Sequence, residues 1–116
     1  MNLRRGDTGK FKFQRLDAEG QPITTIADEV YFTVKKNTKT QDYLIQKKLE
    51  DMTFDEDGTY HFVIEPEDTN SLKYSDDYVY DIEVTQDGDV STIAIGTFAL
   101  LEEVTFASNK GEQDGE

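Results

Sequence analysis

The residues in this chain that could do chemistry are one histidine, a few serines and many acids. The chain has 116 residues, 25 of them Asp or Glu, and it contains no cysteine. It therefore has no thiolate nucleophile, no thiolate metal ligand and no disulfide. His61 lies between Tyr60 and Phe62, so a strand at this position would turn it to the face opposite the two aromatic rings. We interpret His61 as an isolated surface residue, because a zinc site needs further nitrogen or sulfur ligands.

Neither the serines nor the paired acids form a pattern typical of an active site. An activated serine often lies in a glycine-flanked elbow and works with a histidine and an acid, and no such elbow occurs here. A glycosidase needs two carboxyl groups that face each other across a cleft, whereas adjacent acids arise by composition alone in so acidic a chain. We therefore predict no enzyme activity and no catalytic, cofactor-binding or metal-binding residue. The serines are Ser71, Ser75, Ser91 and Ser108, and the acidic pairs include Glu67-Asp68, Asp76-Asp77 and Glu102-Glu103.

Two short motifs could bind ligands, but both have simpler structural interpretations. Asp55, Glu56 and Asp57 offer hard oxygen ligands for calcium, yet this segment lacks the alternating acids and the final glutamate of a calcium-binding loop. Because Gly58 follows them, these residues favour a hairpin turn. The tripeptide Arg5-Gly6-Asp7 matches the one that integrin-binding proteins display. Glycine between two charged residues is also ordinary at a flexible entry to a first strand.

Tyrosines suggest one binding chemistry that the sequence leaves open. Sandwich domains that bind sugars stack the sugar rings on exposed aromatic side chains, and Tyr31, Tyr43 and Tyr74 could serve in this way. The β propensity of tyrosine and its packing across strands explain the same residues without a ligand. A carbohydrate-binding or cell-surface adhesion module is therefore the alternative function that we keep.

The charge of the chain argues against two classes of partner. The formal net charge is -13, which repels the phosphates of nucleic acids and the head groups of anionic lipids. No stretch is long and apolar enough to span a bilayer. The first six residues carry two arginines but lead into no apolar run, so no secretion signal is recognisable. We expect a protein made in the bacterial cytoplasm, with no nucleic-acid and no membrane partner.

A two-residue period dominates the sequence and predicts β-strands. Alternation of apolar and polar residues places one set of side chains in a core and the other in water. It is clearest around residues 11–13, 30–34, 60–64 and 78–84, and segments 43–49 and 92–100 complete the set. The side chains that we expect in the core are Phe11, Phe13, Val30, Phe32, Val34, Phe62, Ile64, Tyr80, Ile82 and Phe98.

Turn residues separate these strands and set the fold class. Asp87-Gly88 is typical of a tight hairpin, and residues 66–72 could form one or two turns of helix after Pro66. We predict an all-β, immunoglobulin-like antiparallel sandwich of about seven to nine strands, with a small β-barrel as the alternative. The sandwich should span residues 1–106, and residues 107–116 should form a disordered acidic tail.

Taken in order, these features resemble the N-terminal immunoglobulin-like domain of phage baseplate upper proteins and of related small prophage structural proteins of Gram-positive bacteria. The resemblance covers about 100 residues by pattern. It rests on Gly6-Asp7-Thr8 before Phe11-Lys12-Phe13, on residues 27–35, on the turn Asp57-Gly58-Thr59-Tyr60, and on residues 64–69, 78–84 and 96–100.

The resemblance implies a non-enzymatic virion protein, either structural or an assembly accessory, of the tail or baseplate type. Such a protein would act through protein contacts, with other virion proteins or with copies of itself, and would lie in the phage particle once assembled. In baseplate upper proteins the domain continues into a longer chain, whereas this sequence ends at Glu116. Val63 and Val79 are examples of outward apolar positions that could form such contacts.

Overall fold

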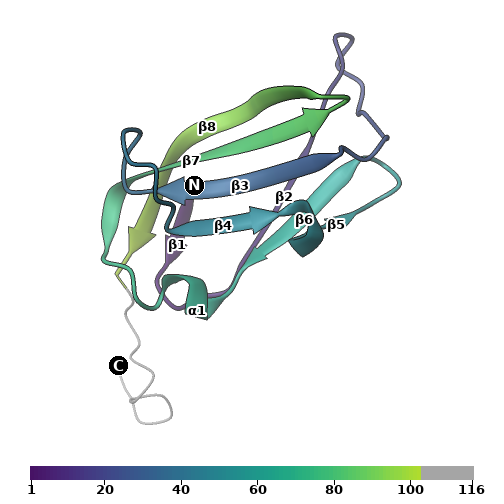
Figure 1. Cartoon of the computed structure of the whole chain (residues 1–116). Coiled ribbons are helices and arrows are strands. Elements are labelled where there is room, and N and C mark those ends of the chain that lie inside the picture. Colours follow the sequence, from purple (N-terminus) through teal and green to yellow (C-terminus); the bar gives the residue numbers. More distant parts are fainter. Residues whose placement is uncertain (103–116) are drawn as a thin grey trace.

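The chain, in which apolar and polar side chains alternate, folds into strands that form two packed sheets. Figure 1 shows this arrangement in a computed structural model. The structure describes residues 1–102. Two short helical turns, the 3-10 helix η1 (Leu49–Asp51) and α1 (Pro66–Thr69), lie between strands. The strands are β1 (Asn2–Arg4), β2 (Gly9–Gln14), β3 (Glu29–Lys35), β4 (Ile45–Lys48), β5 (Thr53–Phe54), β6 (Thr59–Ile64), β7 (Ser75–Gln86) and β8 (Asp89–Leu101).

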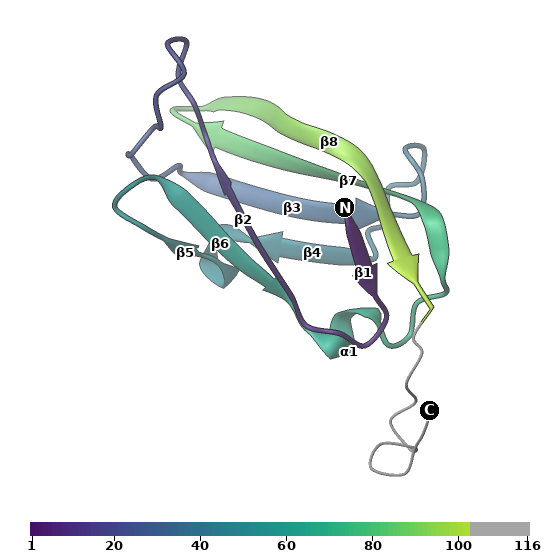
Figure 2. The ribbon, with the colours of Figure 1, turned by 180° about the vertical axis from the view of Figure 1, so that it is seen from behind.

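The strand order confirms the predicted immunoglobulin-like sandwich. One sheet has the order β1-β8-β7-β3-β4 and the other has the order β2-β6-β5. These orders match the A-G-F-C-C′ and B-E-D sheets of an immunoglobulin-like sandwich. Neighbouring strands are antiparallel except for β1, which runs parallel to the end of β8. Figure 1 looks onto the outer face of the five-stranded sheet, and Figure 2 shows the three-stranded sheet in front.

The core lies between the sheets and is largely aromatic. The Phe32 ring of β3 lies 4.6 Å from the Phe62 ring of β6, which joins the two sheets. Tyr60 is fully buried, and its hydroxyl oxygen accepts a hydrogen bond of 3.0 Å from the backbone N–H of Ala27. The buried apolar residues are Leu3, Ala27, Val30, Phe32, Val34, Ile45, Tyr60, Phe62, Ile64, Tyr78, Ile82, Val84, Phe98 and Leu100.

Three residues that we expected in the core are only half-buried. Phe11 and Phe13 lie on β2, an edge strand, so their rings cover the core from the side of the sandwich. Tyr80 lies opposite Gly96, and a Cβ atom at Gly96 would come within 3.0 Å of the Tyr80 ring. The glycine therefore leaves space that this ring occupies at the margin of the core.

The turns follow the predicted chemistry. Asp87 and Gly88 have φ angles of 53° and 84°, as the tight β7-β8 hairpin requires. The expected helix after Pro66 is the single turn α1, in which the Asp68 carboxylate accepts a hydrogen bond from the backbone N–H of Glu65. The predicted tail, residues 107–116, and the predicted domain boundary at 106 lie outside the described residues.

Candidate functional site

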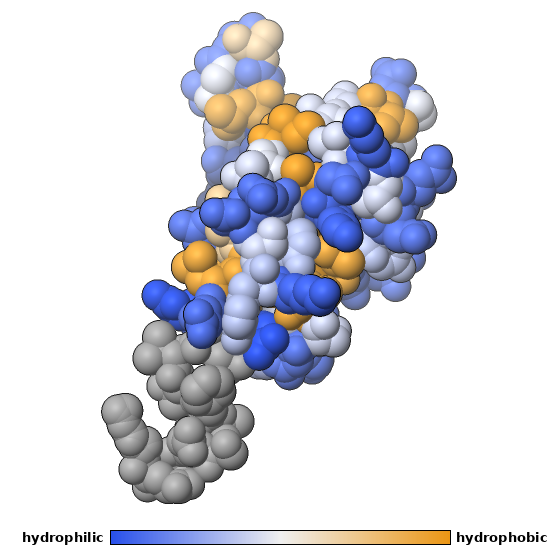
Figure 3. Space-filling view, turned by 90° about the vertical axis from the view of Figure 1, so that its left-hand side faces the viewer, coloured by the Kyte–Doolittle hydropathy of each residue, from blue (hydrophilic) through white to orange (hydrophobic). Residues whose placement is uncertain are grey.

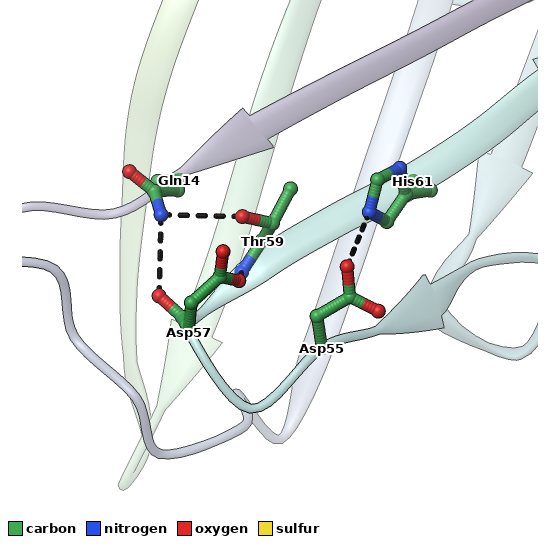
Figure 4. Close-up of polar contacts among 5 residues, drawn as sticks. All are labelled: Gln14, Asp55, Asp57, Thr59 and His61. Atoms are coloured by element: carbon green, nitrogen blue, oxygen red, sulfur yellow. Dashed lines mark hydrogen bonds and ion pairs between the residues drawn. The ribbon is translucent and has the colours of Figure 1, made fainter.

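The acidic turn at residues 55–58 is built from hydrogen bonds within the hairpin (Figure 4). The Asp57 carboxylate accepts a hydrogen bond of 3.0 Å from the backbone N–H of Thr59. Gln14 Nε2 donates to the Asp57 carbonyl oxygen at 3.1 Å and to Thr59 Oγ1 at 3.2 Å. The Thr59 hydroxyl, and then its backbone N–H, lower the pKa of Asp57 from its ordinary value of 3.8. These contacts support the hairpin interpretation of the sequence.

His61 lies on the outer face of the three-stranded sheet, opposite the buried rings, as its position in the sequence predicted. Its Nε2 atom is 2.7 Å from Asp55 Oδ2, so it is paired rather than isolated. Both side chains are well exposed. Across residues 1–102, no three His, Cys, Asp or Glu side chains come together in a way that could hold a metal ion. The pair therefore links the turn between β5 and β6 to His61 within β6. It does not form a cation site in this part of the chain.

The outer face of the five-stranded sheet brings together two of the three tyrosines that the sequence singled out. Tyr31 projects outward from β3 between the buried residues Val30 and Phe32. Tyr43 lies on the β3-β4 loop with 56% of its surface exposed. Both tyrosines line one hollow of about 310 Å³. Lys35, Asp81 and Glu83 also line this hollow.

Two further hollows adjoin this one, because they share lining residues with it. A second hollow of about 200 Å³ shares Thr33, Lys35 and Asp81 with it and extends to Ile95 on β8. A third, of about 330 Å³, shares Tyr31 and extends to η1. We call these three adjoining hollows the outer-face groove. Aromatic rings, amides and charged groups therefore line a shallow surface, without the enclosed shape of a typical active site.

Tyr74 and the Arg5-Gly6-Asp7 tripeptide lie together, away from this groove. The Arg5 guanidinium lies 4.5 Å from the centroid of the Tyr74 ring. It also donates a hydrogen bond to the Leu72 carbonyl oxygen, and the backbone N–H of Gly6 donates to Thr69 Oγ1 at 2.9 Å. These contacts hold the β1-β2 turn against the end of α1 and the segment that follows it, so the tripeptide has a structural role here.

A second concave region, which sequence analysis missed, lies at one end of the sandwich. It has a volume of about 680 Å³ and is lined by polar and charged residues together with apolar ones such as Leu16, Ile23 and Ile93. The Arg15 guanidinium at its wall donates to the Thr25 carbonyl oxygen at 2.6 Å. In the sequence, the one sign of this region is the apolar Leu16 within a segment of polar loop residues. The two-residue period does not assign this segment to a strand.

Within residues 1–102, the remaining serine candidates lie on separate elements. Ser71 is in a turn, Ser75 begins β7 and Ser91 is near the start of β8. Ser108 and Glu103 are outside the described residues. Val63 and Val79 are half-buried and point outward from opposite sheets. The prediction that the protein is not an enzyme stays a prediction.

Comparison with protein families identifies the domain. A family model described as "FctA: Spy0128-like isopeptide containing domain" matches residues 2–111. This match includes every strand of both sheets. The chain belongs to the FctA family. No curated protein matches the chain.

Membership of the FctA family overturns the resemblance to phage baseplate upper proteins. The family is one of Gram-positive pilins, so the phage, prophage, virion, baseplate and tail roles and the virion location that we expected are wrong. The error has a physical source. Alternating aromatic residues, a glycine before a central strand and a tight hairpin are what any immunoglobulin-like sandwich requires. These features therefore predicted the fold but could not distinguish one family of sandwiches from another.

The family description raises the question of an isopeptide bond. Such a bond is an amide between a lysine amine and a side-chain carboxyl or carboxamide group. Its formation needs an uncharged amine, which burial among apolar groups favours. Within residues 1–102, the buried polar residues are Thr59 and Thr69 alone. The core described here therefore has no lysine, acid or amide from which to form that bond.

Lys47 and Asp68 form a lysine–carboxylate contact outside the core. Lys47 Nζ on β4 lies 2.8 Å from Asp68 Oδ2 on α1, and the side chains are 16% and 25% exposed. The same carboxylate oxygen accepts the backbone N–H of Glu65 at 2.7 Å. Both charged groups retain access to water, where the ammonium and carboxylate forms do not condense. We interpret the contact as an ion pair that holds α1 against the sheet.

Proposed function

We propose that this chain is a domain of a pilus or adhesive fibre on the surface of a Gram-positive cell, and that it acts through contacts rather than catalysis. The observation that carries the proposal is the FctA match over residues 2–111, which spans the whole sandwich. This function corresponds to the cell-surface adhesion alternative that the sequence left open.

On the side shown in Figure 3, hydrophobic residues form small patches that hydrophilic residues separate. Small apolar patches are ordinary on protein surfaces and do not by themselves mark a partner. None of the helices in the described part of the chain is long and apolar enough to cross a membrane. We propose that the partners are other proteins of the fibre or further copies of this domain.

Immunogold electron microscopy of intact cells tests the location. An antibody raised against the purified domain should label filaments or the cell surface, and a strain without the gene should show no label. A second sample, of particles released after phage induction, should also be free of gold. Label confined to the cytoplasm or to phage particles would overturn the proposal.

A further inference from the structure

The middle of the outer-face groove, over β3, has no free backbone to offer to a partner. β3 lies between β7 and β4, and it pairs with β7 over residues 29–35 and with β4 over residues 31–34. An extended peptide that binds by adding a strand needs an exposed sheet edge. β3 is an interior strand, and the edge strand β4 lies at one side of the groove. A molecule that binds over β3 is therefore recognised by side chains.

The side chains of the groove combine ring faces with hydrogen-bonding groups. Tyr31 has Lys48 and Glu83 as its cross-strand neighbours, and Thr33 has Gln46 and Asp81. Gln46 Nε2 donates to Thr33 Oγ1 at 3.3 Å, which orients the amide. Through residues 1–102, the structure gives no protein hydrogen bond to the carboxylates of Asp81 and Glu83. These acceptors remain available for the hydroxyl groups of a ligand.

We propose that the outer-face groove binds a neutral oligosaccharide, so that the surface domain proposed above is itself a glycan-binding module. A sugar ring has an apolar face of C–H groups that packs on an aromatic ring, and hydroxyl groups at its edge that pair with amides and carboxylates. Tyr43 and Tyr31 supply the rings. Asp81, Glu83 and Gln46 supply the polar partners beside them.

Charge and shape select the class of sugar. The net charge is -13, and the middle hollow contains two acids and one lysine. Acidic sugars such as sialic or uronic acids are therefore repelled, whereas uncharged hexoses and N-acetylhexosamines are not. The three hollows adjoin through Tyr31 on one side and through Thr33, Lys35 and Asp81 on the other. A row of adjoining hollows suits a linear chain of sugar units better than a single one.

A glycan array followed by NMR titration tests this inference on the full chain. The array carries neutral and acidic oligosaccharides, and the titration adds lactose, cellobiose or di-N-acetylchitobiose to isotope-labelled protein. We expect neutral oligosaccharides to bind and to shift the amide signals of β3, β4 and β7. Tyr43→Ala should weaken binding about tenfold through the loss of one stacking surface. Tyr74→Ala removes a tyrosine that lies outside the groove and should leave the affinity unchanged.

A second substitution separates binding from folding. Glu83→Gln keeps the size of the side chain but replaces the carboxylate, and it should also weaken binding while the thermal melt stays the same. The inference is overturned if no neutral oligosaccharide binds, if acidic ones bind better, or if Tyr43→Ala and Tyr74→Ala have equal effects. Gold on cell-surface filaments together with no sugar binding would overturn this inference alone. Sugar binding together with gold only inside cells would instead overturn the proposed location.

Discussion

The inner and outer faces of the five-stranded sheet are made from alternate residues of the same strands, yet they carry different information. On β3 the inner residues Val30, Phe32 and Val34 are at most 1% exposed, while Tyr31 and Thr33 between them face outward. The inner set satisfies a rule that every sandwich obeys. The outer set is free of that rule, so it can differ from one family to another. The fold is therefore encoded on the inner face, and the binding that we propose depends on the outer face.

Substitution of neighbouring residues on β3 should show this difference most strongly. Phe32→Ala removes a ring that is fully buried between the sheets, and we expect a loss of about 4 kcal/mol in the free energy of unfolding. Thr33→Ala changes the outer face, where it removes the acceptor of the Gln46 hydrogen bond, and should cost about 1 kcal/mol. Urea unfolding followed by circular dichroism measures both. Similar losses for the two variants would show that the outer face is also required for the fold.

Two glycines extend the comparison from strands to turns. Gly58 and Gly88 have similar positive φ angles, but a Cβ atom at Gly58 would lie 2.6 Å from the Ile23 carbonyl oxygen, whereas a Cβ at Gly88 meets nothing within 4 Å. Gly88→Ala should cost about 1 kcal/mol through backbone strain alone. Gly58→Ala adds a clash with backbone and should cost about 3 kcal/mol. Equal losses in unfolding free energy would contradict the close approach to Ile23.

The ion pair of Lys47 and Asp68 should contribute less to the free energy of unfolding, because it lies at the border between the core and water. Asp68→Asn removes the charge but keeps an oxygen that can accept the backbone N–H of Glu65. Lys47→Met removes the other charge and keeps the length of the side chain. A double-mutant cycle from the two should give a coupling of about 1 kcal/mol or less that falls as salt is added. The cycle would contradict an ion pair if the coupling were absent at low salt.

The same residues allow a test for a covalent link. Mass spectrometry of the purified chain with fragmentation should show no cross-link within residues 1–102, because the core of this part of the chain has no lysine or acyl partner buried together. A mass lower by one ammonia or one water would show an isopeptide bond. Fragmentation of that product would then locate the bond, and Lys47→Met would remove the mass difference only if Lys47 formed it.

Sequence patterns predicted the inner face well because apolar alternation is a local signal. Residues 30–34 and 78–84 each show it within one strand, and Asp87-Gly88 marks its turn without help from distant residues. β1 was missed because Asn2–Arg4 has one apolar residue, Leu3, and gains its partner from the far end of the chain, where Leu3 pairs with Leu100. Three residues are too short for a period to appear.

The candidate site was predictable only in part, for a related physical reason. Tyr31 and Tyr43 could be chosen from the sequence as exposed aromatic residues. Their position in one groove depends on the path of the β3-β4 loop, and no local pattern determines that path. The contact between Lys47 and Asp68 likewise joins β4 to α1 across a tertiary interface. Side chains brought together by loops and by packing of separate elements leave no periodic trace in the sequence.

Loss of the Asp57 carboxylate should have the smallest effect on stability, because this residue lies in a fully polar turn outside both faces of the five-stranded sheet. Its pKa is lowered in the folded protein by the Thr59 hydroxyl and backbone N–H. A carboxyl group with a lower pKa in the folded than in the unfolded state stabilises the fold above its unfolded pKa, and this contribution is lost as the pH falls through the folded pKa. The stabilisation should therefore be complete at neutral pH and decline below about pH 3.8.

Asp57→Asn should lower the thermal melting temperature at pH 7 and match the natural sequence more closely in strong acid. A constant difference between the two proteins at all pH values would mean that the size of the side chain, rather than its charge, holds the turn.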